Sequence, residues 1–175
     1  MDINTISNMG KDSETDNHFR IVTANTSKEF SDGRYLFEEY AESLNFSLCF
    51  QDFGHELETI DKHYNLPDGT LILIYDKDIP IACAGIRKLG ETTAELKRMY
   101  VTMQYRGLNL GRLILEQAIT QATALGYQKI RLDTLPDMKA ALKLYYDFGF
   151  YEIQPYRFNP IEGAIYMEKV IRGNP

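Results

Sequence analysis

The stretch QYRGLNLGRLILEQAI, Gln104–Ile119, joins a short polar loop directly to an apolar helical repeat. Two arginines and two glycines stand where that helix is expected to begin: Arg106, Gly107, Gly111 and Arg112. The first turn of a helix carries unpaired backbone N–H groups and the positive end of the helix dipole. Glycines let an anion approach this backbone closely, and arginines add full positive charges. The loop therefore predicts a site for a phosphate-bearing ligand.

The spacing of this loop argues against two common nucleotide-binding motifs. It is not G-x-x-x-x-G-K-[ST], which holds nucleoside triphosphates, and it is not the G-x-G-x-x-G of dinucleotide sites. It matches R/Q-x-x-G-x-G/A, with Arg106, Asn109 and Gly111 at the marked positions. Alone, this pattern is weak, because a helix start decorated with arginines explains it equally well.

Around the loop, hydrophobic periodicity predicts an alternation of strands and helices. The expected strands are 18–24, 70–76, 79–89, 94–101, 129–134, 149–156 and 163–171. The expected helices are 28–44, which contains Gly33, then 52–64, the helix that follows the loop and ends near Gly126, and 138–148. This order predicts a single α/β domain over residues 18–175, preceded by a polar, disordered leader at 1–17.

Composition narrows the class of protein. A net charge of −6 over 175 residues argues against nucleic acid as the main partner, since binding it needs a basic face. No apolar run approaches the ~20 residues of a membrane span, and no secretory pattern opens the chain, so we expect no membrane partner and a cytoplasmic location. Cys49 and Cys83 form no C-x-x-C pair, and Cys83 is expected to be a small buried hydrophobe.

A second motif, ALKLYYDFGF at residues 141–150, fits A-x-x-L-Y-x-x-x-G-F at every specified position. Strand, loop, helix, strand and then this motif, over roughly residues 70–170, resemble the GNAT superfamily of N-acetyltransferases. The resemblance implies an α/β (α+β) fold with a central mixed, mostly antiparallel sheet flanked by helices. Two residues depart from the family pattern. Asn109 stands where the family usually has glycine, and Met138 where many members carry an asparagine that touches the cofactor.

The resemblance implies acetyl-CoA as cosubstrate and no metal. Backbone N–H groups of the loop would hold its pyrophosphate. Its peptide-like pantetheine arm would lie along the strand before the loop, as an added strand does. The implied cofactor-binding residues are Met99, Tyr100, Val101, Arg106, Gly107, Leu108, Asn109, Leu110, Gly111, Arg112 and Met138.

The resemblance also implies two catalytic residues. Glu95 matches the glutamate that many members use as general base, and Tyr145 matches the proton donor to the departing thiolate. Other readings stay open. Glu95 could be an ordinary strand-edge carboxylate paired with Lys97 or Arg98, and Tyr145 could be a core aromatic. Helical spacing places Leu144 and Phe148 on one face and rotates Tyr145 by ~100° from it.

The acceptor is expected between the N-terminal helices and the last hairpin, a region crowded with aromatic side chains: Phe37, Tyr40, Phe46, Phe50 and Phe53. Glu38, Glu39 and Glu42 could attract a cationic amine, although a solvated helix face explains them equally well. His55 and His63 are two helical turns apart, ~12 Å in an unbroken helix, which is too far for one metal ion.

The predicted function is transfer of an acetyl group from acetyl-CoA to a primary amine, on a small molecule or a peptide, by direct attack in a ternary complex. Two alternatives stay open: a CoA-binding regulatory module without turnover, and a transferase that uses another acyl-CoA or a hydroxyl acceptor. The oligomeric state is also open, with a homodimer as one outcome.

Overall fold

A computed structural model of the chain describes residues 19–49 and 52–171. The expected leader, residues 1–17, lies outside this range, as does Phe50. The elements follow one another along the chain as β1 (Phe19–Thr23), α1 (Ser27–Glu42), α2 (Phe53–Glu58), α3 (Ile60–His63), β2 (Thr70–Asp76), β3 (Ile79–Lys88), β4 (Thr93–Val101), the 3-10 turn η2 (Met103–Tyr105), α4 (Leu110–Ala124), β5 (Lys129–Thr134), α5 (Lys139–Asp147), β6 (Tyr151–Ile153) and β7 (Ile165–Val170).

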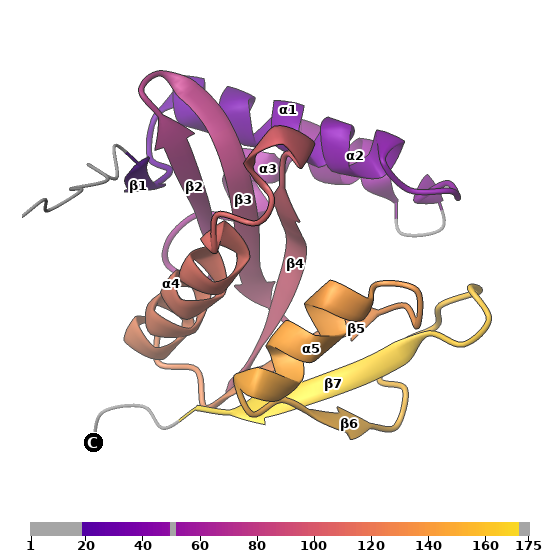
Figure 1. Ribbon diagram of the computed structural model, residues 1–175. Helices are drawn as coiled ribbons and strands as arrows, with labels where there is room; N and C mark the ends of the chain where they lie inside the picture. Colours follow the sequence, from indigo (N-terminus) through magenta and orange to yellow (C-terminus); the bar gives the residue numbers. More distant parts are fainter. Residues whose placement is uncertain (1–18, 50–51, 172–175) are drawn as a thin grey trace, which may run out of the picture.

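One mixed sheet organises the described part of the chain, with seven strands in the order β1-β2-β3-β4-β5-β7-β6 (Figure 1). Neighbouring strands pair antiparallel, except that β4 and β5 run parallel at the centre. The helix α4 supplies the crossover between these two parallel strands, as such a connection requires. The predicted fold class, a mixed and mostly antiparallel sheet flanked by helices, is confirmed.

Helices cover both faces of the sheet. On β2, Leu71 and Leu73 pack with α1 and α3, whereas Ile72 and Ile74 pack on the opposite face with α4. Because side chains alternate along a strand and both faces are covered, β2 reads as a continuous apolar run. Because of this apolar run, the strand bounds predicted from the sequence agree with those of β2.

Helix α1 runs unbroken through Gly33. It begins with a capping box in which Thr26 Oγ1 accepts from the Glu29 N–H at 3.3 Å and Glu29 Oε2 accepts from the Thr26 N–H at 3.0 Å. A Cβ on Gly33 would lie 2.3 Å from Leu71 Cδ2. The glycine therefore lets α1 lie directly on β2. This packing offsets the low helix propensity of glycine.

Two expected elements are shorter than predicted. The helix expected over 52–64 is divided into α2 and α3 at Thr59, whose hydroxyl donates to the His55 carbonyl at 2.6 Å while its backbone leaves the helical region. Such a back-bonded threonine competes with the regular helix. The strand expected over 149–156 is reduced to β6, which ends two residues before Pro155, a residue without an N–H for a strand ladder.

Candidate functional site

The sheet opens where β4 and β5 meet. The two strands pair in parallel over Thr93–Glu95 and then diverge, so that β1–β4 and β5–β7 form the two arms of a V (Figure 1). Just beyond the last pair, Arg98 has φ 54°, and the β3–β4 register shifts between Cys83 and Gly85. Left-handed backbone at a non-glycine residue marks a β-bulge, which bends the strand locally. The bulge lies where β4 separates from β5.

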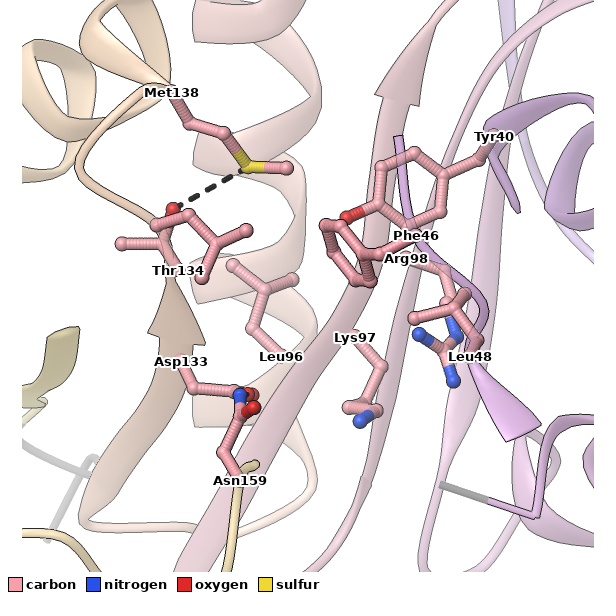
Figure 2. A pocket seen from close by; sticks show the side chains of 11 residues that line it. Tyr40, Phe46, Leu48, Leu96, Lys97, Arg98, Asp133, Thr134, Met138 and Asn159 are labelled. Atoms are coloured by element: carbon pink, nitrogen blue, oxygen red, sulfur yellow. Dashed lines mark hydrogen bonds between the residues drawn. The ribbon is translucent and has the colours of Figure 1, made fainter. Parts of the chain in front are cut away.

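Between the diverging strands lies a cleft with two parts, which we call the β4–β5 cleft. Its inner part, nearest the last strand pair, is shown in Figure 2 and is lined by Tyr40, Phe46, Leu48, Leu96, Lys97, Arg98, Asp133, Thr134, Leu135, Met138 and Asn159. Its outer part, toward the start of α4, is lined by Tyr40, Ser43, Leu44, Met99, Tyr100, Val101, Arg106, Gly111, Asp137, Met138, Lys139, Ala140, Ala141 and Leu144. The two parts are neighbours, because Tyr40 and Met138 line both.

The predicted phosphate loop leads from β4 into α4 with backbone that suits close approach by an anion. Gly107 has φ +84° and Asn109 has φ 63°, and α4 begins at Leu110. Within the described chain, the Asn109 side chain makes no capping hydrogen bond, which leaves the N–H groups of the first turn available to a ligand. Asparagine tolerates this left-handed conformation, so its departure from the family glycine keeps the loop geometry.

The two arginines of the loop flank the start of α4. Arg106 Nε donates to the Val101 carbonyl at 3.2 Å, and its guanidinium lies 5.7 Å from the Tyr100 ring centroid. Arg112 lies over the Phe148 ring at 4.8 Å. Stacking on aromatic rings holds each guanidinium in place while its remaining N–H groups can face a phosphate.

The other predicted cofactor residues divide into two sets. Met99, Tyr100, Val101 and Met138 line the cleft, and the Met138 sulfur accepts from the Thr134 hydroxyl at 3.6 Å (Figure 2). Leu108 is exposed on the loop. Leu110 is buried in the core beneath α4, so that only its backbone can contribute to the phosphate cradle.

Tyr145 lies on the buried face of α5, as in the reading of this residue as a core aromatic. Its side chain is 7% exposed and its ring packs on Phe150 at 5.7 Å, whereas Leu144 and Phe148 are only partly buried. Leu144 faces α4, because a Cβ on Gly111 would lie 3.6 Å from it. The spacing could not tell which of two neighbours α5 presents to the sheet.

Tyr145 is not among the described residues that line either part of the cleft, but two residues that act on its pKa are. Burial raises the pKa of the Tyr145 hydroxyl, and the neighbouring Tyr40 and Asp133 raise it further. Both neighbours line the inner part of the cleft. A tyrosine in these surroundings stays protonated at neutral pH, so it can donate a hydrogen bond or a proton.

Glu95 occupies the paired end of β4, and its side chain is fully buried. Its Oε2 accepts from Arg87 Nε at 2.9 Å, and its Oε1 accepts from the Tyr156 hydroxyl at 2.9 Å and pairs with Arg157 at 2.9 Å. Arg87 and Arg157 are therefore ion-pair partners of Glu95 that the sequence did not indicate. Its predicted role as general base stays a prediction.

Lys97 is a cleft residue that the sequence reading did not single out. It lies on β4 two residues beyond Glu95, lines the inner part of the cleft and is 5% exposed. Burial lowers the pKa of its ammonium to about 7, with Glu95 opposing that effect and Arg98 adding to it. Nothing in the local sequence EL-K-RM signals this burial, since it arises from residues far along the chain.

Two further ionic contacts form the walls of the inner part. Arg98 pairs with Glu56 of α2 at 2.5 Å, and both side chains are 4% exposed. Asp133 of β5 pairs with Arg157 and accepts from Asn159 Nδ2 at 2.9 Å, which ties the loop between β6 and β7 to the cleft. The loop YRFNPIEG thus lies beside the cleft, as expected for the acceptor region.

The aromatic, glutamate and histidine residues of the N-terminal region lie in different surroundings. Phe37 is buried in the core, Tyr40 and Phe46 line the cleft, and Glu39 accepts from the Tyr100 hydroxyl at 2.9 Å. The rings of His55 and His63 lie 6.1 Å apart, closer than an unbroken helix would place them, because the helix divides at Thr59.

The described residues contain neither a cluster that could hold a metal ion nor a helix that could span a membrane. Within residues 19–49 and 52–171, no cluster of three or more His, Cys, Asp or Glu side chains could hold a metal ion. In the same residues, none of the helices combines the length and the apolar character needed to cross a membrane.

Comparison with known proteins gives consistent matches. Residues 34–150 match the model of the acetyltransferase (GNAT) family. An uncharacterized N-acetyltransferase of Schizosaccharomyces pombe is 33% identical over 142 residues, which cover 80% of this chain and 87% of that protein. An uncharacterized N-acetyltransferase of Dictyostelium discoideum is 27% identical, over 73% of this chain and 87% of that protein.

Solved structures share the fold at lower identity. The crystal structure of an acetyltransferase from Streptococcus agalactiae superposes with a TM-score of 0.74 at 19% identity, covering 89% of this chain and 99% of that one. The structure of yncA from Salmonella typhimurium, solved with its cofactor acetyl-CoA, gives a TM-score of 0.66 at 15% identity, covering 90% of this chain and 96% of that one.

Proposed function

The chain belongs to the acetyltransferase (GNAT) family, and we propose that it transfers an acetyl group from acetyl-CoA to a primary amine by direct attack in a ternary complex. One observation carries the proposal. The open edge of β4 at Met99–Val101 lines the cleft that continues to the first turn of α4. Among the described residues, this strand edge has no paired neighbour and the helix start has no side-chain cap, which suits a peptide-like arm that ends in a diphosphate.

The residues of the cleft fit this cosubstrate. The backbone N–H groups of residues 107–112 would cradle the pyrophosphate, with Arg106 and Arg112 supplying charge on either side. Space exists for close approach, since a Cβ on Gly107 would meet nothing within 4 Å. The backbone of Met99–Val101 would pair with the pantetheine amides. Acetyl-CoA supplies the thioester that an amine can attack, and the cleft positions that thioester.

Tyr145 is proposed as the proton donor to the departing thiolate. Burial raises its pKa, so the hydroxyl is protonated at neutral pH, and the neighbouring Tyr40 and Asp133, which raise the pKa further, are cleft residues. Donation at the sulfur assists departure, because a thiol is a better leaving group than a thiolate. The ring itself is fixed by packing on Phe150, so the hydroxyl is held in one place.

Of the two cysteines, Cys49 is exposed, whereas Cys83 is unsuited to carry an acyl group because of where it lies. Its side chain is buried in the core between α1 and β2–β4, and its Sγ donates to the Arg98 carbonyl at 3.2 Å. Burial raises the pKa of this thiol, which keeps it in the unreactive neutral form. In the proposed direct attack, the amine itself is the nucleophile toward the thioester.

The test of the proposed function is release of free thiol from acetyl-CoA across a panel of primary amines. The panel includes arylalkylamines, polyamines and peptides with free N-termini, together with a matched alcohol for each amine. We expect thiol release that depends on at least one amine and formation of the corresponding acetamide by mass spectrometry. The double variant Arg106→Ala/Arg112→Ala should need more acetyl-CoA to reach the same rate.

Other outcomes of this assay separate the alternatives. Binding of CoA, seen as a raised melting temperature, without thiol release would favour a CoA-binding regulatory module. Turnover with the alcohols, or faster turnover with propionyl-CoA than with acetyl-CoA, would favour a different acyl transfer. The absence of both CoA binding and turnover would contradict the proposal outright.

A further inference from the structure

We propose that Tyr40 is a further catalytic residue of the transfer: its hydroxyl donates a hydrogen bond to the carbonyl oxygen of the thioester and stabilises the negative charge that forms there when the amine attacks. The inference rests on the proposed function and adds a residue of α1 that neither the family resemblance nor the comparisons assign. It also gives the place where the two parts of the β4–β5 cleft meet a role in the reaction.

The first argument is the position of Tyr40 on α1. Leu36 and Phe37 of the same helix are fully buried, and Tyr40 follows one turn later on the same face. Tyr40 is only partly buried and lines both parts of the cleft, so this turn of α1 faces the cleft where the preceding turn faces the core. Figure 2 shows its hydroxyl end pointing away from α1 and into the inner part.

The second argument is that the Tyr40 hydroxyl has no partner in the protein. Exposed Tyr35 interacts with Glu39, and within the described residues only the hydroxyls of Tyr40 and Tyr145 have no such interaction. Tyrosine hydroxyls near the interior usually bond to the protein, so these two are available to a bound ligand. The other described tyrosines each donate to a protein oxygen: Tyr64, Tyr75, Tyr100, Tyr105, Tyr127, Tyr146, Tyr151, Tyr156 and Tyr166.

The Tyr40 oxygen also faces open space. Among the described residues, the enclosed side-chain oxygens and nitrogens that lack a partner are the hydroxyls of Thr70 and Thr102. Tyr40 is not one of them, so its oxygen is reached from the cleft instead of being sealed in the core. A tyrosine hydroxyl in this situation can donate to a group of a bound ligand.

Packing holds the Tyr40 ring in one orientation before a ligand binds. Its ring centroid lies 5.7 Å from that of Tyr100. Tyr100 is fixed in turn by donation to Glu39 at 2.9 Å and by the Arg106 guanidinium, 5.7 Å from its ring centroid. A donor that is fixed beforehand stabilises developing charge without reorganising during the reaction. The ring contact also places Tyr40 beside a residue proposed to pair with the pantetheine arm.

The surroundings keep Tyr40 in the form that donates. Burial raises the pKa of its hydroxyl, Arg98 opposes this effect, and Asp133 adds to it, so the hydroxyl is protonated at neutral pH. Tyr40 is also near enough to Tyr145 to raise the pKa of that hydroxyl. Two protonated hydroxyls are therefore available to the two polar atoms of a thioester. With Tyr145 proposed at the sulfur, Tyr40 is assigned to the carbonyl oxygen.

The bonds and protons of the reaction balance with this assignment. The neutral amine nitrogen forms a bond to the acetyl carbon, and the π electrons of the carbonyl move to its oxygen, which accepts the hydrogen bond from Tyr40. The carbonyl then re-forms as the bond from carbon to sulfur breaks. The sulfur takes a proton from Tyr145, whose hydroxyl recovers one from the acylated nitrogen. Tyr40 keeps its proton throughout, and the products are the acetamide and the free thiol.

The kinetic test removes the hydroxyl and keeps the ring. Tyr40→Phe should lower kcat by ~10²-fold or more, the scale for loss of one donor to an oxyanion, while the dissociation constant for acetyl-CoA stays within about twofold. Tyr35→Phe is the matched control on the same helix, because Tyr35 is 56% exposed, and it should change neither value. An unchanged kcat in Tyr40→Phe would overturn the proposal.

A second measurement reads the carbonyl directly and needs no turnover. Acetyl-CoA labelled with 13C at the acetyl carbonyl is bound to the protein without an amine, and the carbonyl resonance is recorded by NMR. A hydrogen bond to the carbonyl oxygen moves this resonance downfield. We expect a downfield shift on binding to the wild-type protein and to Tyr145→Phe, and a smaller shift on binding to Tyr40→Phe.

Two results of the NMR measurement would overturn the proposal. One is a bound resonance in the wild-type protein at the position of free acetyl-CoA, which needs no variant to interpret. The other is the same shift in Tyr40→Phe as in the wild-type protein. A shift that is lost in Tyr145→Phe and kept in Tyr40→Phe would exchange the roles of the two tyrosines and overturn this assignment alone.

The outcomes keep this proposal separate from the proposed function. A wild-type protein that binds acetyl-CoA but releases no thiol with any amine of the panel would contradict acetyl transfer. In that case the carbonyl resonance still decides whether Tyr40 contacts the thioester. Absence of acetyl-CoA binding would contradict both proposals.

Discussion

Two ionisable residues of β4, Glu95 and Lys97, lie in contrasting surroundings. At the paired end, Glu95 is enclosed by Arg87, Arg157 and Tyr156, so its charge is balanced and its oxygens are occupied. Two residues further along, where β4 has left β5, Lys97 lines an open cleft and its pKa is lowered to about 7. The difference teaches that the divergence of the strands, more than residue type, decides which group is available for chemistry.

The largest effect is expected at the paired end, from Glu95→Gln. The amide keeps the shape of the side chain but removes the buried counter-charge of Arg87 and leaves Arg157 paired with Asp133 alone, which should destabilise the fold by about 3–5 kcal/mol. Unfolding in urea measures this loss. Glu91→Gln is the matched control, because the Glu91 side chain is 92% exposed and its pair with Lys88 should contribute less than ~1 kcal/mol.

Kinetics of the same variant sharpen the comparison. If Glu95 only holds the arginines and the β6–β7 loop, the folded variant loses rate by the same factor at every pH. A loss that is greatest at low pH, and is rescued as free amine accumulates at high pH, would restore Glu95 as the general base and place the chemistry at the paired end.

On α5, Tyr145→Phe should lower kcat by ~10²-fold or more, about 2.7 kcal/mol, while the dissociation constant for CoA stays within about twofold. The substitution removes only the hydroxyl, and the ring keeps its packing on Phe150. Tyr146→Phe tests the neighbour on the same helix, since the Tyr146 side chain is 48% exposed and its hydroxyl donates to Glu152. Turnover of Tyr145→Phe at the wild-type rate would show that the proton donor is another group.

A pH-dependent change in stability is expected from Lys97→Met. The folded pKa of Lys97 is about 7 and the unfolded value about 10.4, so between these values the unfolded chain binds the extra proton. Wild-type stability should therefore rise with pH across that window, by about 1.4 kcal/mol per pH unit, as the penalty for burying the amine is lost. The Met variant has no such penalty.

The advantage of Lys97→Met over wild type should accordingly shrink by about 2 kcal/mol between pH 7.5 and pH 9. Thermal and urea unfolding at the two pH values measure it, with Lys143→Met as the exposed control, 76% accessible at its side chain. A difference that does not change with pH would mean that Lys97 keeps an ordinary pKa in the folded protein.

The smallest effect is expected at the phosphate loop, from Asn109→Gly. Glycine adopts the left-handed backbone of this position freely, and the asparagine side chain makes no capping bond within the described residues. CoA affinity should change by about twofold or less. Asn109→Ala provides the contrast, because alanine in left-handed backbone costs about 1–2 kcal/mol. A large loss of affinity in the glycine variant alone would reveal a direct contact from the asparagine side chain.

The sequence predicted best what depends on local pattern. The bounds of β2 and β5 follow from continuous apolar or alternating runs, and the loop before α4 follows from its glycines and arginines. The motif around Tyr145 did not tell which side of α5 packs in the core, since both Tyr145 and its apolar neighbours Leu144 and Phe148 contact the core.

What the sequence could not predict depends on contacts between distant segments. Glu95 is paired with Arg157, which is 62 positions further along the chain, and Lys97 lines the cleft together with Tyr40 of α1 and Asp133 of β5. Neither the divergence of β4 from β5 nor the enclosure that follows has a local signature. The contrast between the surroundings of Glu95 and those of Lys97 is therefore a property of the folded molecule.

The central claim is that the part of β4 that has diverged from β5 holds the cosubstrate together with the start of α4. Hydrogen exchange of backbone amides on addition of CoA tests this claim most directly. We predict slower exchange at residues 99–101 and 107–112, no change at residues 93–95, and a weaker response in Arg106→Ala/Arg112→Ala at the same CoA concentration. Protection that appears elsewhere while residues 99–101 and 107–112 exchange as before would contradict the account.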